Sequence, residues 1–361
     1  MSRFTDISLS RDCCAVMRGM AIVAIVLHNY CHMLPGTPDE NEFWYLQRHS
    51  DAFVHALAVS RHLVADVLSF AGWYGVPVFM FLTGYGLVMK YERGGAPLAP
   101  RRFLGDSFLK LFYLMLPGVV LMTATIAIAA LAGGKGVSLS LFWNEALQLT
   151  MLPDVLLPLV PPSPGVYWYF GLTMQFYVIY VLLIYRRPSW WMAVAVAVSL
   201  VSQALLSHSY ADLAWLRHNS AGWVMVLVLG VVYGRSRPVP LSLAVAVTSL
   251  SALVFVSAML NERAWQLSLL AAVFIAVAVG RLSVLVPLWR DLWIWLGQLS
   301  PFLFAAHPVV RQWFFLAFPR EHSMVQMALY LAACIAVALA YRQLWQLTRT
   351  GFRRLAPAYF G

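Results

Sequence analysis

Apolar segments recur along the whole chain, and most of them are long enough to cross a membrane. A hydrocarbon core about 30 Å thick requires a helix of about 18 residues or more. The run from Ala193 to Leu206 is apolar on every face, whereas strands of an outer-membrane barrel alternate apolar and polar residues over about 10 positions. The pattern therefore predicts an all-α polytopic membrane protein with about ten transmembrane helices. The predicted helices span 14–34, 70–90, 109–132, 165–185, 190–207, 221–234, 239–260, 264–280, 291–316 and 324–345.

The distribution of Lys and Arg predicts how these helices are oriented. The two ends of the chain and the loops after every second helix, together with the helix ends beside them, hold 18 basic residues, whereas the opposite loops hold 6. Because loops rich in Lys and Arg stay in the cytoplasm, both termini are expected to be cytoplasmic. Two of the opposite loops are long, 35–69 and 133–164. Their amphipathic stretches, Phe43–Leu63 and Leu141–Leu152, predict short helices on the outer surface, the second followed by the proline-rich Leu157–Pro164.

Composition agrees with this interpretation. Hydrophobic residues make up 61% of the 361 positions and charged residues 11%, against about 25% charged in soluble domains. The mean hydropathy is +0.73. The net charge of +10 would suggest nucleic acid as a partner of a soluble protein, but here topology explains it. We expect one integral membrane domain over residues 1–361. Membrane lipid is an expected partner, and nucleic acid is not.

The few ionisable side chains within the predicted helices are candidate functional residues, because each costs at least ~2.5 kcal/mol in the hydrocarbon region. Arg18 and His28 lie on the first helix, ~15 Å apart along its axis and ~80° apart around it, so both can line one cavity. Arg18, near the cytoplasmic face, is suited to bind phosphate, and His28, deep in the bilayer, to transfer a proton. Alternatively, Arg18 extends to the interface and His28 bonds a neighbouring helix.

A second pair lies on the ninth predicted helix, where His307 and Arg311 share one face. Either side chain could orient an acceptor. Pro301 and Pro308 predict a kink or break in this helix, and a histidine that closes such a kink is the structural alternative.

Two further segments combine packing with possible substrate contacts. Gly75–Leu87 holds small residues that allow close approach, and Tyr85 in it could donate a hydrogen bond. Tyr167–Tyr169 has the aromatic character of a membrane interface, although Trp168 within it could stack on a sugar.

Four sequence fragments, in the expected order over nearly the whole chain, resemble the membrane acyltransferase 3 family of predominantly bacterial O-acyltransferases. They are RGMAI from Arg18 with the later His28, GVPVFMFLTGYGL from Gly75, WY at Trp168 with QFY from Gln175, and GQLS from Gly297 with HP at His307. The family often shows Arg-x-x-Arg shortly after the second helix, whereas here Ser107–Lys110 stands in that place and Arg101 and Arg102 lie slightly upstream.

The resemblance implies transfer of an acyl group, commonly acetyl, from cytoplasmic acyl-CoA to a hydroxyl of a glycan or lipid-linked saccharide at the outer face of the cytoplasmic membrane. It implies no permanently bound cofactor, and no cluster with metal-ligand spacing is visible in the sequence. His28 is the expected catalytic residue, as a general base or as a nucleophile. The donor-binding candidates are Arg18, Arg101, Arg102 and Lys110, and the candidates for contact with the acceptor are Tyr85, Trp168, Ser300, His307 and Arg311.

Two other functions fit the same residues. A transporter of a polar metabolite would use His28, His307 and Arg311 as a relay and anion site, and would move its substrate without an acyl donor. A non-catalytic scaffold would need the charged groups only for assembly.

Overall fold

The structure, a computed structural model, describes residues 9–134, 136–152, 155, 167–236 and 241–355, and within them it is helical without strands. Each of the ten predicted segments contains a helix within its described residues. The helices are α1 (Arg11–Cys31), α2 (Gln47–Val59), α3 (Leu63–Ala71), α4 (Gly75–Val88), α5 (Pro100–Ala132), α6 (Leu139–Gln148), α8 (Trp168–Ile179), α9 (Ser189–Leu206), α10 (Tyr210–His218), α11 (Ser220–Arg235), α12 (Leu241–Met259), α13 (Leu267–Ser283), α14 (Pro287–Ala317) and α15 (Met324–Leu355).

Within the described residues, six helical segments are long and apolar enough to cross a membrane. They are Arg11–Cys31, Leu63–Arg93, Pro100–Ala132, Ser189–Leu206, Ser242–Met259 and Met324–Leu347. Three shorter apolar segments accompany them: Trp168–Ile184, Ser220–Arg235 and Leu267–Ser283. The helices therefore support a multi-pass membrane protein, whereas the count of about ten spans and the side on which the termini lie stay predictions.

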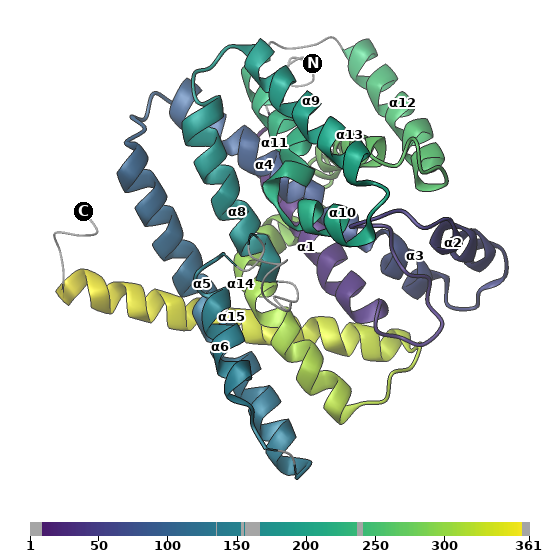
Figure 1. Ribbon diagram of the computed structural model, residues 1–361, viewed down its shortest axis with the longest axis vertical. Coiled ribbons are helices and arrows are strands. Elements are labelled where there is room, and N and C mark those ends of the chain that lie inside the picture. The colour runs from purple at the N-terminus through teal and green to yellow at the C-terminus, as the bar shows by residue number, and fades with distance from the viewer. Residues whose placement is uncertain (1–8, 135, 153–154, 156–166, 237–240, 356–361) are drawn as a thin grey trace.

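Helix α1 occupies the centre of the bundle (Figure 1), where it packs against α14, α3, α4 and α13. Its closest neighbour is α14, and glycine makes this approach possible. A Cβ atom on Gly19 would collide with the carbonyl oxygen of Trp293, and one on Gly297 with that of Ala15. Two helix backbones in direct contact are a common packing mode in membranes, and here the contact fixes the helix that carries Arg18 and His28.

The second predicted helix, expected over 70–90, is longer in the structure. It begins at Leu63 with α3, passes through a 3₁₀ turn at Gly72–Tyr74 into α4, and ends in a π-helical turn at Met89–Arg93. Residues 63–69 were expected in the loop 35–69, but Asp66 among them is buried and accepts a hydrogen bond from Ser60. This early start places α3 beside the end of α1.

The two short loop helices are confirmed as α2 and α6, while the proline-rich Leu157–Pro164 lies outside the described residues. Two other features differ from expectation. Helix α14 continues unbroken through Pro301 and Pro308, so the predicted break is absent. Helix α10, which the sequence pattern placed in a loop, follows α9 and packs on α11.

Candidate functional site

The imidazole of His28 lies near the end of α1 and is 6% exposed. Its Nδ1 atom is 3.2 Å from the carbonyl oxygen of Leu68 on α3. Because a carbonyl oxygen only accepts hydrogen bonds, this contact favours the tautomer in which Nδ1 carries the proton. The Nε2 atom then has a lone pair, and His28 has the form that a general base or a nucleophile requires.

Gly72, at the junction of α3 and α4, makes room for His28. A Cβ atom there would lie 2.6 Å from the Cβ atom of His28 and 2.8 Å from the carbonyl oxygen of Ala24. The position of the imidazole therefore depends on a glycine at the start of the second predicted helix.

The change Gly72→Ala is expected to destabilise the protein by about 1–3 kcal/mol, because the added methyl group must displace α1. It should also lower activity by moving His28. Gly86→Ala on the same segment is the matched control, since a Cβ atom at Gly86 meets nothing within 4 Å. Thermal unfolding in detergent gives the melting temperature of each variant. Equal melting temperatures would contradict the close contact between Gly72 and α1.

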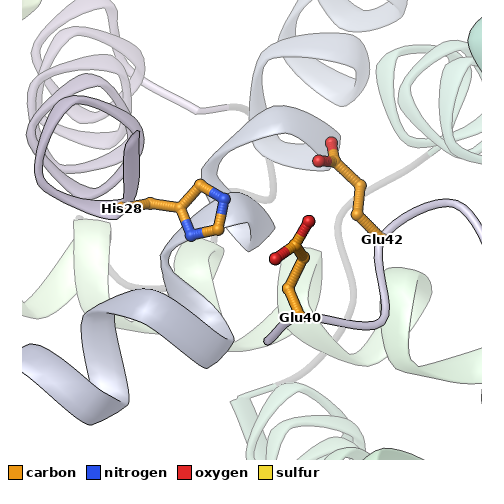
Figure 2. A group of neighbouring side chains, drawn as sticks. All are labelled: His28, Glu40 and Glu42. Atoms are coloured by element: carbon orange, nitrogen blue, oxygen red, sulfur yellow. The ribbon is translucent and has the colours of Figure 1, made fainter. Parts of the chain in front are cut away.

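Two carboxylates face His28 from the loop that follows α1 (Figure 2). Glu40 and Glu42 each present an oxygen to the cluster, and these oxygens and a ring nitrogen of His28 all lie within 4.8 Å of one another. The backbone around them is held by hydrogen bonds to three carbonyl oxygens. Ser69 Oγ donates to Pro38, His49 Nδ1 to Glu40 and Trp265 Nε1 to Asn41, each at 2.8 Å.

Glu40 is the ionised member of this pair. Its Oε2 atom is 2.7 Å from Nδ1 of His32, one turn beyond His28 on the chain. Burial alone would raise the pKa of Glu40, but the contact with His32 and the charges of His28 and His32 outweigh burial and lower the pKa to about 2. The same contact raises the pKa of His32. Glu40 therefore provides a permanent negative charge beside His28.

Glu42 has a different environment. It is 8% exposed, and among the described residues no basic nitrogen lies within 4.0 Å of its carboxylate. Burial raises the pKa of Glu42 well above its usual range, and the charge of Glu40 raises it further, against the opposing charge of Arg217. The two carboxyl groups thus differ in their affinity for a proton.

One imidazole and two carboxylates are also a donor set that can hold a metal ion. The expectation that no metal is bound stays a prediction.

A cavity of about 500 Å³ adjoins this loop. Its walls come from residues 36–39, from α2 and from the region around Asp66 and His322. Asp39, which lines it, lies next to Glu40, so one loop forms a wall of the cavity and also presents Glu40 to His28.

The four predicted donor-binding residues lie on α1 and at the start of α5, and all are exposed. Arg18 donates from Nε to the carbonyl oxygen of Cys14 at 3.3 Å, and its exposed position on an otherwise central helix leaves the guanidinium accessible. Arg102 lies 3.7 Å from Asp106 on the surface. Arg101 and Lys110 flank this pair on the same helix.

Of the residues expected to contact the acceptor, His307 interacts with His28 and Arg311 with the residue that follows it. His307 is fully buried; its Nδ1 atom is 3.1 Å from the carbonyl oxygen of Leu303, while Nε2 has no hydrogen-bond partner. A positive charge on His307 would repel a positive charge on His28. Arg311 donates to both the backbone and the side-chain oxygen of Asn29, each at 3.0 Å, and so ties α14 to the residue after His28.

The other three are held within the bundle. Tyr85 donates from its hydroxyl to the carbonyl oxygen of Leu9 at 3.1 Å, and Ser300 to that of Gly297 at 2.8 Å. Trp168 stacks on Trp223 with ring centroids 6.0 Å apart. These contacts account for the burial of the three side chains, and their part in substrate binding stays a prediction.

Sequence reasoning missed Glu40, Glu42 and His32 as partners of His28. The signal available was the acidic run at 39–42 immediately after the first predicted helix. A loop has no fixed period, so nothing in the pattern showed that this run folds back over the helix end.

A family model described as an acyltransferase domain matches residues 15–342, nearly the whole chain. The chain belongs to the acyltransferase 3 family. No curated protein and no solved structure gives a significant match. The family and the apolar helices together identify a multi-pass membrane acyltransferase, and His28, the residue that carried the resemblance in α1, is the residue on which the carboxylates of this acyltransferase converge.

Proposed function

We propose that this acyltransferase moves an acyl group, with acetyl as the expected group, from cytoplasmic acyl-CoA to a hydroxyl of a cell-surface or lipid-linked glycan. The observation that carries the proposal is the state of His28: a buried imidazole whose Nδ1 atom bonds a backbone carbonyl and whose ring faces an ionised carboxylate. This is the arrangement of a base that must become positively charged during one step and neutral again afterwards.

In the proposed reaction, the acceptor hydroxyl gives its proton to Nε2 of His28 while its oxygen attacks the carbonyl carbon of the thioester. The new C–O bond forms, and the electron pair of the C=O bond moves onto oxygen. When this intermediate collapses, the C–S bond breaks and the leaving sulfur takes the proton from His28. Glu40 stabilises the imidazolium between these two transfers.

The alternative route makes Nε2 of His28 the nucleophile, with a transient acyl-imidazole that the hydroxyl then attacks. It uses the same nitrogen and the same carboxylate. Rapid quenching of the protein with labelled acetyl-CoA in the absence of acceptor separates the two routes, because only the second leaves label on the chain.

The donor is expected to reach His28 from the side of Arg18. The ~15 Å between the two residues along α1 is comparable with the reach of a pantetheine arm. The predicted cytoplasmic side has a net charge of +13, which attracts an anionic nucleotide. The accessible guanidinium of Arg18 supports its proposed contact with the phosphates, together with Arg101, Arg102 and Lys110.

Replacing Arg18 by Gln is expected to raise the Kd for CoA about 10-fold, the equivalent of about 1.4 kcal/mol for one charge-assisted hydrogen bond. Calorimetric titration of purified protein with CoA gives this value. Arg263→Gln, in a predicted outer loop, is the control and should bind CoA as the wild type does. Equal affinity of all three proteins would remove Arg18 from the donor site.

The function itself is tested by thioester turnover in detergent. Purified protein receives labelled acetyl-CoA, and the release of free CoA is measured with and without a glycan extract. Acceptor-dependent release supports the proposal. A folded protein that neither binds CoA nor releases it would contradict the proposal, and flux of polar metabolites into proteoliposomes without an acyl donor would then favour the transporter.

A further inference from the structure

Two carboxyl groups face one imidazole, and the structure gives them unlike surroundings. Glu40 has its charge matched by His32 at 2.7 Å. Glu42 lies on the same loop, is 8% exposed and has no basic nitrogen within 4.0 Å among the described residues. A second negative charge at Glu42 would be both desolvated and repelled by Glu40.

The charged groups that face Glu42 are Glu40, His28 and Arg217. Arg217 favours an ionised Glu42, but none of its nitrogens lies within 4.0 Å of that carboxylate, and other groups contact part of its guanidinium. The group lies over the rings of Trp265 and Trp223, 4.1 and 4.9 Å from their centroids, and its Nη1 donates to Gln266 at 3.0 Å. Contact with aromatic faces stabilises this cation, while Nε and Nη2 of Arg217 are buried without a hydrogen-bond partner among the described residues. Arg217 is therefore near Glu42 but not paired with it.

We propose that Glu42 is a neutral carboxylic acid in the resting enzyme and that its O–H group donates a hydrogen bond to the oxyanion of the tetrahedral intermediate. This inference rests on the proposed acyl transfer. When carboxyl groups in one site have environments that separate their pKa values, they commonly take different chemical roles. Here Glu40 acts as the anion that stabilises the imidazolium, and Glu42 acts as the hydrogen-bond donor to the oxyanion.

The step balances without a co-reactant. The attacking hydroxyl loses its proton to Nε2 of His28, and the carbonyl oxygen of the thioester becomes negatively charged. Glu42 keeps its proton and shares it in a hydrogen bond with that oxygen. When the C–S bond breaks, the C=O bond re-forms and the hydrogen bond weakens, while His28 returns its proton to the sulfur.

Paired substitutions at Glu42 and Glu40 test these roles. Gln keeps an N–H donor but has no charge, so Glu42→Gln is expected to retain turnover within about 5-fold, whereas Glu42→Leu should lose about 100-fold. Glu40→Gln removes a charge that is needed, so it should cost far more than the same change at Glu42. If Glu42→Gln is as inactive as Glu42→Leu, Glu42 acts as an anion and the proposal is wrong.

The pH profile gives a readout that a merely structural role would not change. Turnover by the wild type should fall at high pH as Glu42 loses its proton, and this fall should be absent from Glu42→Gln. An identical basic limb in both proteins would overturn the proposal.

Infrared spectroscopy tests the protonation state without any turnover. The wild type should show the carbonyl stretching band of a protonated carboxyl group at neutral pH, and Glu42→Gln should lack it. If the band persists in Glu42→Gln, Glu42 is not the protonated group. If the wild type shows no turnover with any acceptor, the proposed function fails, while the band still decides whether Glu42 is neutral.

Discussion

The change His28→Gln is expected to lower acyl-CoA turnover about 1000-fold, the middle of the range for loss of a general base. Gln is similar in length and polar, but its amide has no basic nitrogen that can accept the hydroxyl proton. The affinity for CoA should stay within about 2-fold, because Arg18 lies about 15 Å from His28 along α1 and the other residues expected to bind the donor lie on α5. Steady-state release of CoA gives the first quantity, and calorimetric titration gives the second.

His55→Gln is the control for this variant. His55 is exposed on α2, outside the cluster that surrounds His28, and its replacement should leave turnover unchanged. A folded His28→Gln protein with nearly full turnover would show that another group accepts the proton. Loss of CoA binding in that variant would instead show that His28 contributes to the donor site.

The change Glu40→Gln is expected to lower turnover about 100-fold, because the imidazolium of His28 loses the negative charge beside it, the equivalent of about 2.7 kcal/mol in the transition state. Asp39→Asn is the matched control. Asp39 is the preceding residue and its side chain is 63% exposed, so its charge is screened by solvent. Similar losses in both variants would mean that the loop, and not the charge of Glu40, supports catalysis.

The acidity of Glu40 also predicts a stability profile. Its pKa is about 2, below the ordinary value of 4.5, so its ion pair with His32 stabilises the folded state above pH 4.5. This contribution should disappear as the pH falls from 4.5 to about 2. At the other end, the pair should weaken once the pH exceeds the raised pKa of His32. Melting temperatures of the wild type and Glu40→Gln should therefore converge at low pH.

Much of the fold followed from the hydropathy pattern, because a helix that crosses a membrane must be apolar over a fixed length. His28 was found for the same reason, since an ionisable group in such a helix is conspicuous. The start of α3 was not predicted, since residues 63–69 were assigned to the loop 35–69. They include Asp66, which is polar but buried with a hydrogen-bond partner. Hydropathy alone does not separate such a residue from a loop residue.

The acidic half of the site could not be predicted. Glu40 and Glu42 reach His28 only because hydrogen bonds from Ser69, His49 and Trp265 hold their loop over the end of α1. Trp265 is more than 220 positions away in the chain, and a single sequence contains no signal for a pairing at that distance. The role of Gly72 could not be predicted either. A Cβ atom at this position meets His28 and Ala24 only because α1 and α3 pack side by side.

The most direct test of the central claim is transfer of label across the membrane. Inside-out membrane vesicles with wild-type protein receive acetyl-CoA labelled in the acetyl group on the outside, which is their cytoplasmic face, and alkali-labile label is then measured in the glycan fraction. Labelled ester is expected with the wild type and about 1000-fold less with His28→Gln. Equal labelling by the two proteins, or none with a wild type that is folded and binds CoA, would contradict the proposed acyl transfer through His28.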